Sequence, residues 1–360
     1  EFVVDIMSAI ILLLFTILWK KVLCAKKPNV IYILSDDLGY DDLYFQSQQI
    51  RTPNIDKLIS EEGQFLSWYY AQCVCSTSRS TLLTGRYPLH HGINGAILWT
   101  TPMGLNLNET LLPQVLLQNG YNTHAIGKWH LGMYRWPYTP TFRGFESFYG
   151  YYGGGENYYT HKAGNYYDFR FDVGQNCGPN CSIVYTDAYQ NYSTFLFTQR
   201  AIDIVKAHNK SKPLFMYLAY QAVHAPTQAP SYYVEPYANT IQDTQRRTFA
   251  GMLAAMDDGI GNLTKVLQKE GYMDENLIIA FTADNGCPIP NSGVGDETGC
   301  RNWPLRGGKH SVWEGGTRVV SGIWTTPDLI PKQYTGGNYT HLMHISDWMP
   351  TLLDAAGIDI

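Results

Sequence analysis

The sequence predicts an α/β fold. Unbroken apolar runs of strand length alternate with longer segments of helical spacing, and 45% of the 360 residues are hydrophobic, which is enough for one large α/β domain or two smaller ones. The clearest strand is Asn29–Ser35, an apolar run that ends abruptly at Asp36 and Asp37, as a buried parallel strand does at its carboxyl end. Ligands of open α/β sheets bind at that edge, so the residues that follow each strand are candidates for a site.

The other elements follow from the same patterns. We expect helices over residues 55–62, 111–118, 194–208 and 244–269, a helix from Cys75 to Gly85, and a last helix capped by Ser346 and Asp347. Strands are predicted over residues 65–70, 122–127, 213–220, 277–282 and 319–324. Residues 148–167 are crowded with Tyr and Gly and predict a long irregular loop, either a lid or a packed surface loop. We favour a wall that faces the substrate.

Charge and targeting signals limit the partners. The net charge of −5 and the absence of any Lys/Arg run longer than a pair argue against a nucleic-acid surface. The apolar run at residues 10–19 is too short for a membrane span and predicts a signal peptide over residues 1–24, with Met7 as the true start; Lys20 and Lys21 leave a signal anchor as the alternative. Six Asn-x-Ser/Thr sequons agree with entry into the secretory pathway: Asn108, Asn180, Asn191, Asn209, Asn262 and Asn338. We therefore expect a lysosomal or secreted glycoprotein with no stable membrane span after signal removal.

Cys75 is the candidate reactive residue. It stands at the predicted start of a helix, where unpaired N–H groups and the helix dipole favour an anion. Arg79, four residues later, lies on the same helix face as a second positive element. A reactive side chain beside an anion pocket is the expected arrangement.

Polar residues follow several of the predicted strands. Asp36 and Asp37 can both face one ion only if the strand breaks after them, which Leu38-Gly39 allows. The others are Lys128 and His130, which would project to one side of an extended chain, then His224, and Asp284 with Asn285. Taken singly, each of these motifs is more often a solvated turn or a hydrogen-bonded core residue.

Together the motifs resemble the type I sulfatases. The sequence Cys75-x-x-Ser78-Arg79, followed by Leu83-Thr84-Gly85-Arg86, is similar to the family signature, and five motifs recur in the family's order from about Lys27 to Ala356. Residues 127–135 and 302–316, the latter containing Lys309, are most similar to the arylsulfatase B group, which acts on sulfated N-acetylgalactosamine. The resemblance implies a three-layer α/β/α sandwich of the alkaline phosphatase superfamily with a mostly parallel sheet. Residues 25–360 would be a catalytic domain truncated before a smaller C-terminal subdomain.

The resemblance also implies the cofactors. Cys75 would be oxidised to formylglycine by a formylglycine-generating enzyme, and Asp36, Asp37, Asp284, Asn285 and the oxidised residue 75 would hold a metal ion. Ligation by oxygen alone favours Ca²⁺ over zinc. With Cys24 removed and Cys75 modified, we expect disulfides Cys177–Cys181 and Cys287–Cys300 and an unpaired Cys73.

The reaction implied is hydrolysis of a sulfate ester of a sulfated carbohydrate or an aryl sulfate. Arg79 would stabilise the hydrated aldehyde at residue 75, with Asp284 as base. Substrate binding would fall to Lys128, His224 and Lys309, of which His224 or Lys309 protonates the leaving group, and His130 would help to re-form the aldehyde.

Two alternatives remain open. A phosphodiester or phosphonate hydrolase could use the same scaffold. Thr77 stands where the family usually has Pro or Ala, so an unmodified, inactive relative that binds sulfate or glycans is the other alternative.

Overall fold

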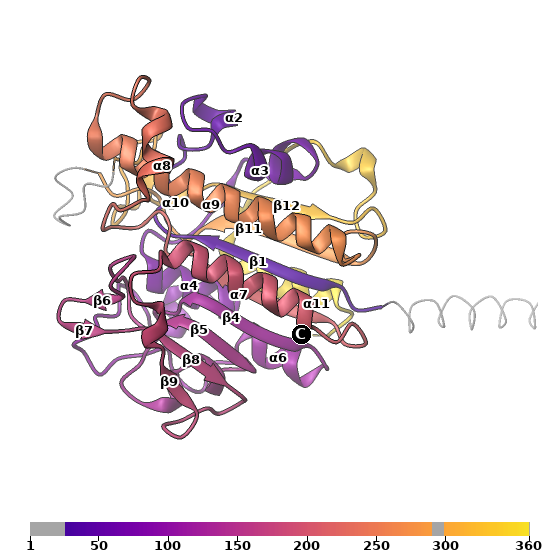
Figure 1. The fold of residues 1–360 in the computed structure, drawn as a ribbon. Helices are drawn as coiled ribbons and strands as arrows, with labels where there is room; N and C mark the ends of the chain where they lie inside the picture. The colour runs from indigo at the N-terminus through magenta and orange to yellow at the C-terminus, as the bar shows by residue number, and fades with distance from the viewer. Residues whose placement is uncertain (1–25, 290–298, 360) are drawn as a thin grey trace, which may run out of the picture.

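The computed structural model describes residues 26–289 and 299–359, and the expected signal peptide lies outside this part. The described chain is built around a ten-stranded sheet (Figure 1). In spatial order its strands are β13 (Gly337–Tyr339), β2 (Gln64–Leu66), β12 (Ser321–Thr325), β11 (Leu277–Ala283), β1 (Asn29–Ser35), β10 (Leu214–Ala219), β4 (Asn122–Lys128), β5 (Ser147–Tyr151), β8 (Arg170–Val173) and β9 (Ser182–Val184).

The centre of the sheet is parallel and its flanks are mixed. Strands β11, β1, β10, β4 and β5 pair in parallel, and Val30 in β1 lies between Phe215 and Ile278. β12 pairs antiparallel with β11 and β2, and β8 pairs antiparallel with β5 and β9. Central strands are covered on both faces, which is why they are continuous apolar runs in the sequence. The mostly parallel sheet that was predicted is confirmed.

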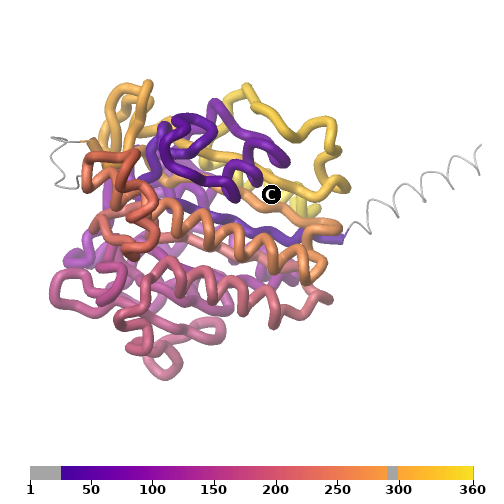
Figure 2. Tube along the Cα trace, turned by 45° about the horizontal axis from the view of Figure 1, so that its top comes forward, coloured from indigo at the N-terminus to yellow at the C-terminus, as the bar shows by residue number. Residues whose placement is uncertain are grey.

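Helices cover both faces of the sheet and complete three layers. In Figure 1, α7 (Ser193–Ala207) and α9 (Thr244–Lys269) lie in front of the sheet, and Figure 2 shows them running side by side. Behind the sheet lie α4 (Cys75–Thr84), α6 (Leu112–Gln118) and α11 (Trp348–Ala355). The predicted α/β/α sandwich is therefore confirmed.

Helix α9 shows why these segments fold as they do. Its apolar side chains recur every three or four residues and are fully buried: Phe249, Leu253, Met256, Ile260, Leu263 and Leu267. Each such burial stabilises the fold by about 1.5–3 kcal/mol before entropy is counted. The helix begins after Asp243, whose Oδ1 accepts a hydrogen bond from Arg246 N at 2.6 Å.

Several short elements differ from the prediction. The helix expected over 55–62 is α3 (Pro53–Asp56), which continues as a π-helical turn, η1 (Lys57–Glu61). The strand expected over 65–70 is split into β2 and β3 (Tyr69–Tyr70). The predicted loop 148–167 begins inside β5 and contains a hairpin, β6 (Lys162–Ala163) and β7 (Tyr166–Tyr167). The strands β8, β9 and β13 were not predicted, because short strands at or near the edges of the sheet lack a clear apolar period. Other short elements are α2 (Tyr44–Ser47), α5 (Pro88–His91), α8 (Ser231–Val234), α10 (Glu314–Thr317) and β14 (Met343–His344).

Both expected disulfides are present, Cys177–Cys181 and Cys287–Cys300, and Cys73 is unpaired in the part of the chain described. All six sequon asparagines are exposed and so are accessible to glycosylation. Within residues 26–289 and 299–359, no helix combines the length and apolarity needed to cross a bilayer.

Candidate active site

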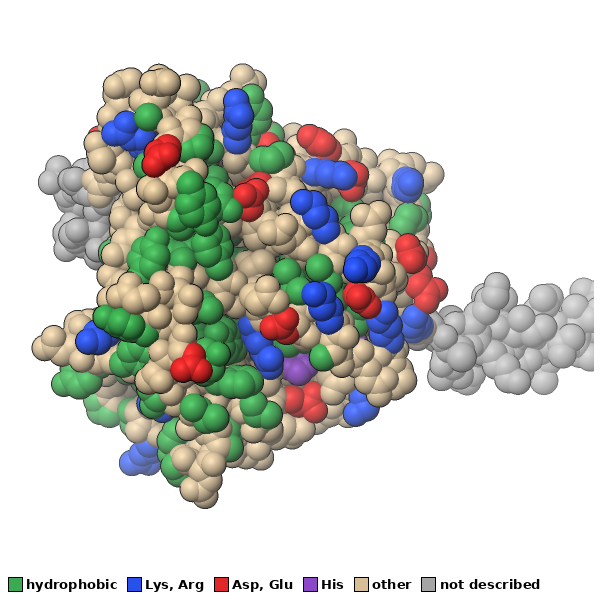
Figure 3. All heavy atoms as spheres, viewed as in Figure 1, with side chains coloured by type: hydrophobic (Ala, Val, Ile, Leu, Met, Phe, Trp, Pro, Cys, Tyr) green, Lys and Arg blue, Asp and Glu red, His purple; other side chains and the backbone are tan. Residues whose placement is uncertain are grey.

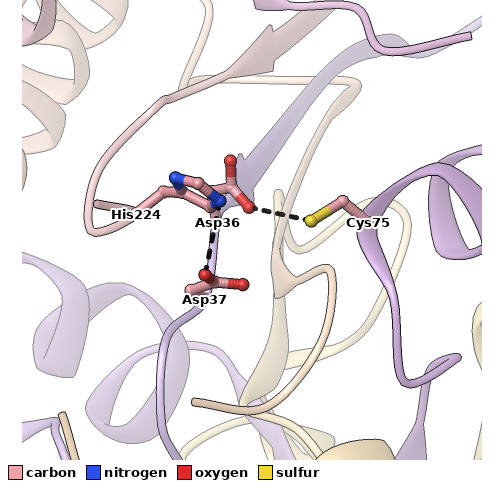
Figure 4. A group of neighbouring side chains, drawn as sticks. All are labelled: Asp36, Asp37, Cys75 and His224. Atoms are coloured by element: carbon pink, nitrogen blue, oxygen red, sulfur yellow. Dashed lines mark hydrogen bonds and ion pairs between the residues drawn. The ribbon is translucent and has the colours of Figure 1, made fainter. Parts of the chain in front are cut away.

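The carboxyl ends of four neighbouring parallel strands bring the candidate residues together. Asp36 and Asp37 follow β1, Lys128 ends β4, His224 lies in the loop after β10, and Asp284 follows β11. Figure 4 shows Asp36 pointing towards Cys75 and Asp37 towards His224. The site thus occupies the sheet edge at which α/β proteins bind ligands.

The backbone at Asp37 allows both adjacent carboxylates to serve one centre. Asp37 has φ +59°, in the left-handed region, which costs a non-glycine residue on the order of 1 kcal/mol or more. Asp36 accepts hydrogen bonds from Cys75 Sγ at 3.5 Å and from Lys128 Nζ at 2.5 Å. Asp37 accepts from Lys309 Nζ at 2.8 Å and from Asn285 Nδ2 at 2.6 Å. The predicted break after this pair therefore begins at Asp37 itself.

Cys75 is the first residue of α4, as predicted, although none of the Ser and Thr residues in its first turn caps the helix. The N-cap residue is Val74, and no side chain caps the helix. Ser78 instead uses its hydroxyl to accept a hydrogen bond from Gln72 N at 3.0 Å. The helix closes at Gly85, which has φ +64° and donates to Thr81 O. The amino end of α4 thus presents Cys75 towards the centre without a competing side-chain acceptor.

The Cys75 thiol is a poor nucleophile in this position. It is 2% exposed, and burial raises its pKa to about 12, since the opposing effect of Lys128 is smaller. At neutral pH the side chain is therefore a thiol rather than the reactive thiolate.

Arg79 is fully buried and connects α4 by hydrogen bonds to the carboxyl ends of β4 and β11. Its Nε and Nη2 donate to Asp284 Oδ2 at 3.0 and 2.8 Å, and its Nη1 donates to Lys128 O at 3.0 Å. Burial and then Asp36 raise the pKa of Asp284 to about 6, against the opposing effect of Arg79. Burial alone would also raise the pKa of Asp36, but nearby cations, led by Lys128, hold it well below its usual range.

Formal charges in the centre are balanced. The carboxylates Asp36, Asp37 and Asp284 contact the cations Lys128, Lys309 and Arg79. Burial by itself would lower the pKa of Lys309, yet the Asp37 carboxylate raises it well above its usual value, so the ammonium stays charged. A divalent cation and an anion could enter this centre together without leaving a large buried net charge.

His130 departs from the extended chain that was predicted. β4 ends at Lys128, and His130 has φ +61°, so the two side chains are not placed by a continuing strand. Its Nε2 lies 3.0 Å from Ile97 O, which can only accept, so Nε2 carries the proton. Burial, with Lys128 next, lowers the pKa of His130 well below its usual value, and its buried Nδ1 has no partner among the described residues. Nδ1 is thus an unprotonated acceptor.

His224 lies at the more exposed side of the centre. Its side chain is 14% exposed, and its Nε2 lies 3.6 Å from Asp37 Oδ2. Its Nδ1 donates to Ala225 O at 2.6 Å, and burial, with Lys309 next, lowers its pKa. Nε2 is therefore available to a ligand.

The donor set can be tested for a metal ion. One ligand atom each from Asp36, Asp37, Cys75 and His224 lies within 4.8 Å of the other three. Asn285 adds an Oδ1 that is buried and without a hydrogen-bond partner among the described residues, and Asp284 Oδ1 lies 3.3 Å from Asp37 N. Carboxylate and amide oxygens predominate and fit Ca²⁺. The sequence prediction did not include His224 among the metal ligands.

Three supporting residues were not found from the sequence. Ile97 holds His130 through its carbonyl, and the Tyr158 hydroxyl donates to His224 O at 2.8 Å. A Cβ at Gly154 would lie 2.6 Å from His130 Nε2, so this position needs glycine for the ring to fit. The Tyr- and Gly-rich segment 148–167, which contains Gly154 and Tyr158, was the sequence signal for two of them.

The chain is similar to known proteins over most of its length. Residues 28–358 match the sulfatase family model. The chain is 42% identical to Mus musculus arylsulfatase J over 343 residues, covering 92% of this chain and 52% of that protein. It is 31% identical to Homo sapiens N-acetylgalactosamine-6-sulfatase over 354 residues, covering 92% of this chain and 62% of that protein. The chain thus spans between half and two thirds of the length of these two relatives.

Solved structures share the fold of this chain. The fold superposes on a crystal structure of Ps i-CgsB in complex with k-i-k-neocarrahexaose with a TM-score of 0.81 and 33% identity, covering 93% of this chain and 73% of that one. A phosphonate monoester hydrolase of Agrobacterium radiobacter shares the fold, with a TM-score of 0.64 and 18% identity, covering 92% of this chain and 74% of that one.

Proposed function

The chain belongs to the sulfatase family, and we propose that it hydrolyses sulfate esters at the centre around Cys75. The proposal is carried by one observation, the convergence of buried acids and bases on Cys75, which opens α4 and lies 3.5 Å from Asp36. Because the chain spans only part of its relatives' length, the activity of the whole protein is part of this proposal.

Two groups supplied after translation would complete the centre. Formylglycine, made from Cys75 by a formylglycine-generating enzyme, would supply when hydrated a nucleophilic hydroxyl, which the buried thiol does not provide. Asp36, Asp37, Asp284 and Asn285 would hold Ca²⁺, which when bound would polarise a sulfate oxygen. The unpartnered Oδ1 of Asn285 supports this assignment.

The side chains of this centre would bind and orient the sulfate. Lys128 and Lys309 are buried and charged, so they can neutralise sulfate oxygens as negative charge develops. His224 lies nearest to solvent, where the leaving oxygen would depart, and it or Lys309 would give that oxygen its proton. Lys309 already carries a proton, whereas neutral His224 holds its proton on Nδ1 and would first have to be protonated at Nε2.

The remaining residues would hold the nucleophile in place. Arg79 fixes Asp284 through two hydrogen bonds, which positions that carboxylate as the base. His130, whose Nδ1 is unprotonated, would accept the proton released when the nucleophile is regenerated.

The substrate that we propose is a sulfated N-acetylgalactosamine of a glycosaminoglycan. Support comes from the resemblance of residues 127–135 and 302–316 to the arylsulfatase B group, and from the similarity to N-acetylgalactosamine-6-sulfatase. The exposed sequons and the two disulfides support a lysosomal or extracellular location.

The first experiment measures the mass of the peptide that contains Cys75, together with turnover. Conversion to formylglycine lowers the peptide mass by roughly 18 Da. We expect the converted protein to hydrolyse p-nitrocatechol sulfate much faster than bis(p-nitrophenyl) phosphate. An unchanged mass with no turnover would instead identify an inactive binding relative, and preference for the phosphodiester would identify a phosphodiester hydrolase. Elemental analysis that finds zinc rather than calcium would contradict the metal assignment.

A further inference from the structure

A cavity of about 890 Å³ lies outside the cluster of catalytic candidates. Three segments line it: residues 99–100 from one loop, residues 133–139 beyond β4, and residues 152–170, which include the β6–β7 hairpin. Its size suits a sugar ring with substituents, since small-molecule pockets are of this volume.

The cavity is joined to the catalytic centre through His130. Ile97, whose carbonyl accepts from His130 Nε2, lies two residues before the lining residue Trp99. His130 N donates to the carbonyl of Tyr152, another lining residue, at 3.0 Å. The cavity wall is therefore adjacent to His130, one of the residues of the catalytic centre.

Exposed aromatic rings form one side of the cavity. Trp99 is 45% exposed and Tyr166 is 63% exposed, and their ring centroids lie 5.1 Å apart. Figure 3 shows hydrophobic side chains gathered at the end of the molecule that carries the β6–β7 hairpin. Aromatic faces of this kind are suited to stacking against the apolar face of a pyranose ring.

Two arginines give the cavity a positive charge. In the part of the chain that the structure describes, neither Arg135 nor Arg170 has a carboxylate within ion-pair distance. Arg170 lies over the Tyr152 ring at 5.9 Å, and its buried Nε has no hydrogen-bond acceptor there. A guanidinium group in this state can bind a carboxylate or a sulfate through two parallel hydrogen bonds.

Asp168 is the one carboxylate that lines the cavity. Its oxygens accept backbone hydrogen bonds from Tyr152 N at 3.2 Å and from Gly153 N at 2.7 Å. Burial raises the pKa of Asp168 and of the nearby Asp172, and Arg170 partly opposes both shifts, so part of the Arg170 charge is already offset. Among the residues that line the cavity, the two arginines still outnumber this one carboxylate.

We propose that this cavity is a second sugar subsite, which binds an anionic pyranose linked to the sugar whose sulfate is removed. The anionic group is a carboxylate or a sulfate, held by Arg170 and Arg135, and the ring stacks on Trp99 and Tyr166. This inference rests on the proposed function and deepens it, because it assigns the residues that would bind the sugar next to the one whose sulfate is removed.

The test compares two substrates in four proteins. The substrates are p-nitrocatechol sulfate and a tetrasaccharide of alternating uronate and sulfated N-acetylgalactosamine. The proteins are the wild type, Arg170→Gln, Trp99→Ala and Arg51→Gln. Arg51 serves as the control because it is an exposed arginine outside the cavity. We expect the ratio of kcat/KM for the tetrasaccharide to that for the aryl sulfate to fall about 10- to 100-fold in Arg170→Gln, mainly through KM, as for loss of a charge-assisted hydrogen bond. Trp99→Ala should lower the same ratio about tenfold, and Arg51→Gln should leave it as in the wild type.

Binding separates failure of the subsite from failure of the proposed function. Calorimetry with the same tetrasaccharide and Cys75→Ser protein needs no turnover, and Arg170→Gln on that background should weaken binding at least tenfold. Equal binding in both proteins, or an unchanged selectivity ratio in both cavity variants, would overturn the subsite. Reduction of the uronate carboxyl to an alcohol identifies the anion: if it removes the effect of Arg170→Gln, the carboxylate is bound, and if the effect persists, the sulfate is bound. A wild type that binds the tetrasaccharide in this way but hydrolyses neither substrate would overturn the sulfatase activity and leave the subsite in place.

Discussion

Replacing Lys128 by Ala is the most direct test of the catalytic centre. Lys128 Nζ lies 2.5 Å from Asp36 Oδ2, and the residue is 1% exposed, so this cation is held in place before a ligand binds. The substitution removes one of the three cations in the centre. It would leave the carboxylates in excess at the position where we propose that a sulfate anion binds.

The magnitude follows from this geometry. Losing one preorganised donor to a developing oxyanion costs about 100- to 1,000-fold in kcat, or roughly 2.7–4 kcal/mol. Some stability will also be lost, because breaking a buried ion pair costs about 3–5 kcal/mol. We expect the lower end of that range, since Asp36 keeps Arg79 Nη2 at 3.7 Å.

Turnover of p-nitrocatechol sulfate is the assay, performed on folded protein in which conversion of Cys75 has been verified by mass. Lys210→Ala is the matched control, because Lys210 forms an exposed ion pair with Glu270 at 3.5 Å, and such pairs contribute at most about 1 kcal/mol. The control should keep wild-type kcat. A Lys128→Ala protein that is folded and keeps about a third or more of the wild-type kcat would refute the role assigned to this cation.

Three further predictions concern stability. When Ca²⁺ is added to chelated protein at about 100 times its Kd, we expect the free energy of unfolding to rise by about 2.7 kcal/mol and Tm to rise by several degrees. Asn285→Ala should greatly reduce this rise in Tm, measured by a thermal melt. Equal rises in both proteins would contradict the role of Asn285 as a ligand. Burial lowers the pKa of His124 to about 4, so below about pH 6.5 the unfolded state binds the proton first and stability is lost as pH falls. Denaturant titrations at pH 7 and pH 5 measure how much the free energy of unfolding falls between these two pH values. This fall should be about 1–2 kcal/mol smaller in His124→Gln than in the wild type, and an equal fall in both proteins would argue against the role of His124. Replacing Cys287 and Cys300 by Ser should lower the free energy of unfolding by about 3 kcal/mol. It should also lower turnover, because Cys287 O accepts a hydrogen bond from Lys309 N at 3.0 Å. A variant with wild-type Tm and kcat would contradict both effects.

The sequence by itself determined the central elements and the chemistry of the centre. β1 and α9 have the predicted bounds, since a buried strand needs a continuous apolar run and a long surface helix needs an apolar residue every three or four positions. Asp36 and Asp284 could be selected because parallel strands all place their carboxyl ends at one edge of the sheet. Cys75 could be selected because the amino end of a helix favours an anion.

Only the tertiary structure decided how those residues meet. The left-handed backbone at Asp37, the contact of Lys128 with Asp36 across 92 positions, and the carbonyl of Ile97 that sets the protonation of His130 depend on loops without any period. The cavity between Trp99 and Arg170 likewise could not be predicted from the sequence, because its walls come from three separate segments. Local spacing specifies which strands and helices form, whereas contacts between loops depend on how the whole chain packs, and no pattern within one segment records that.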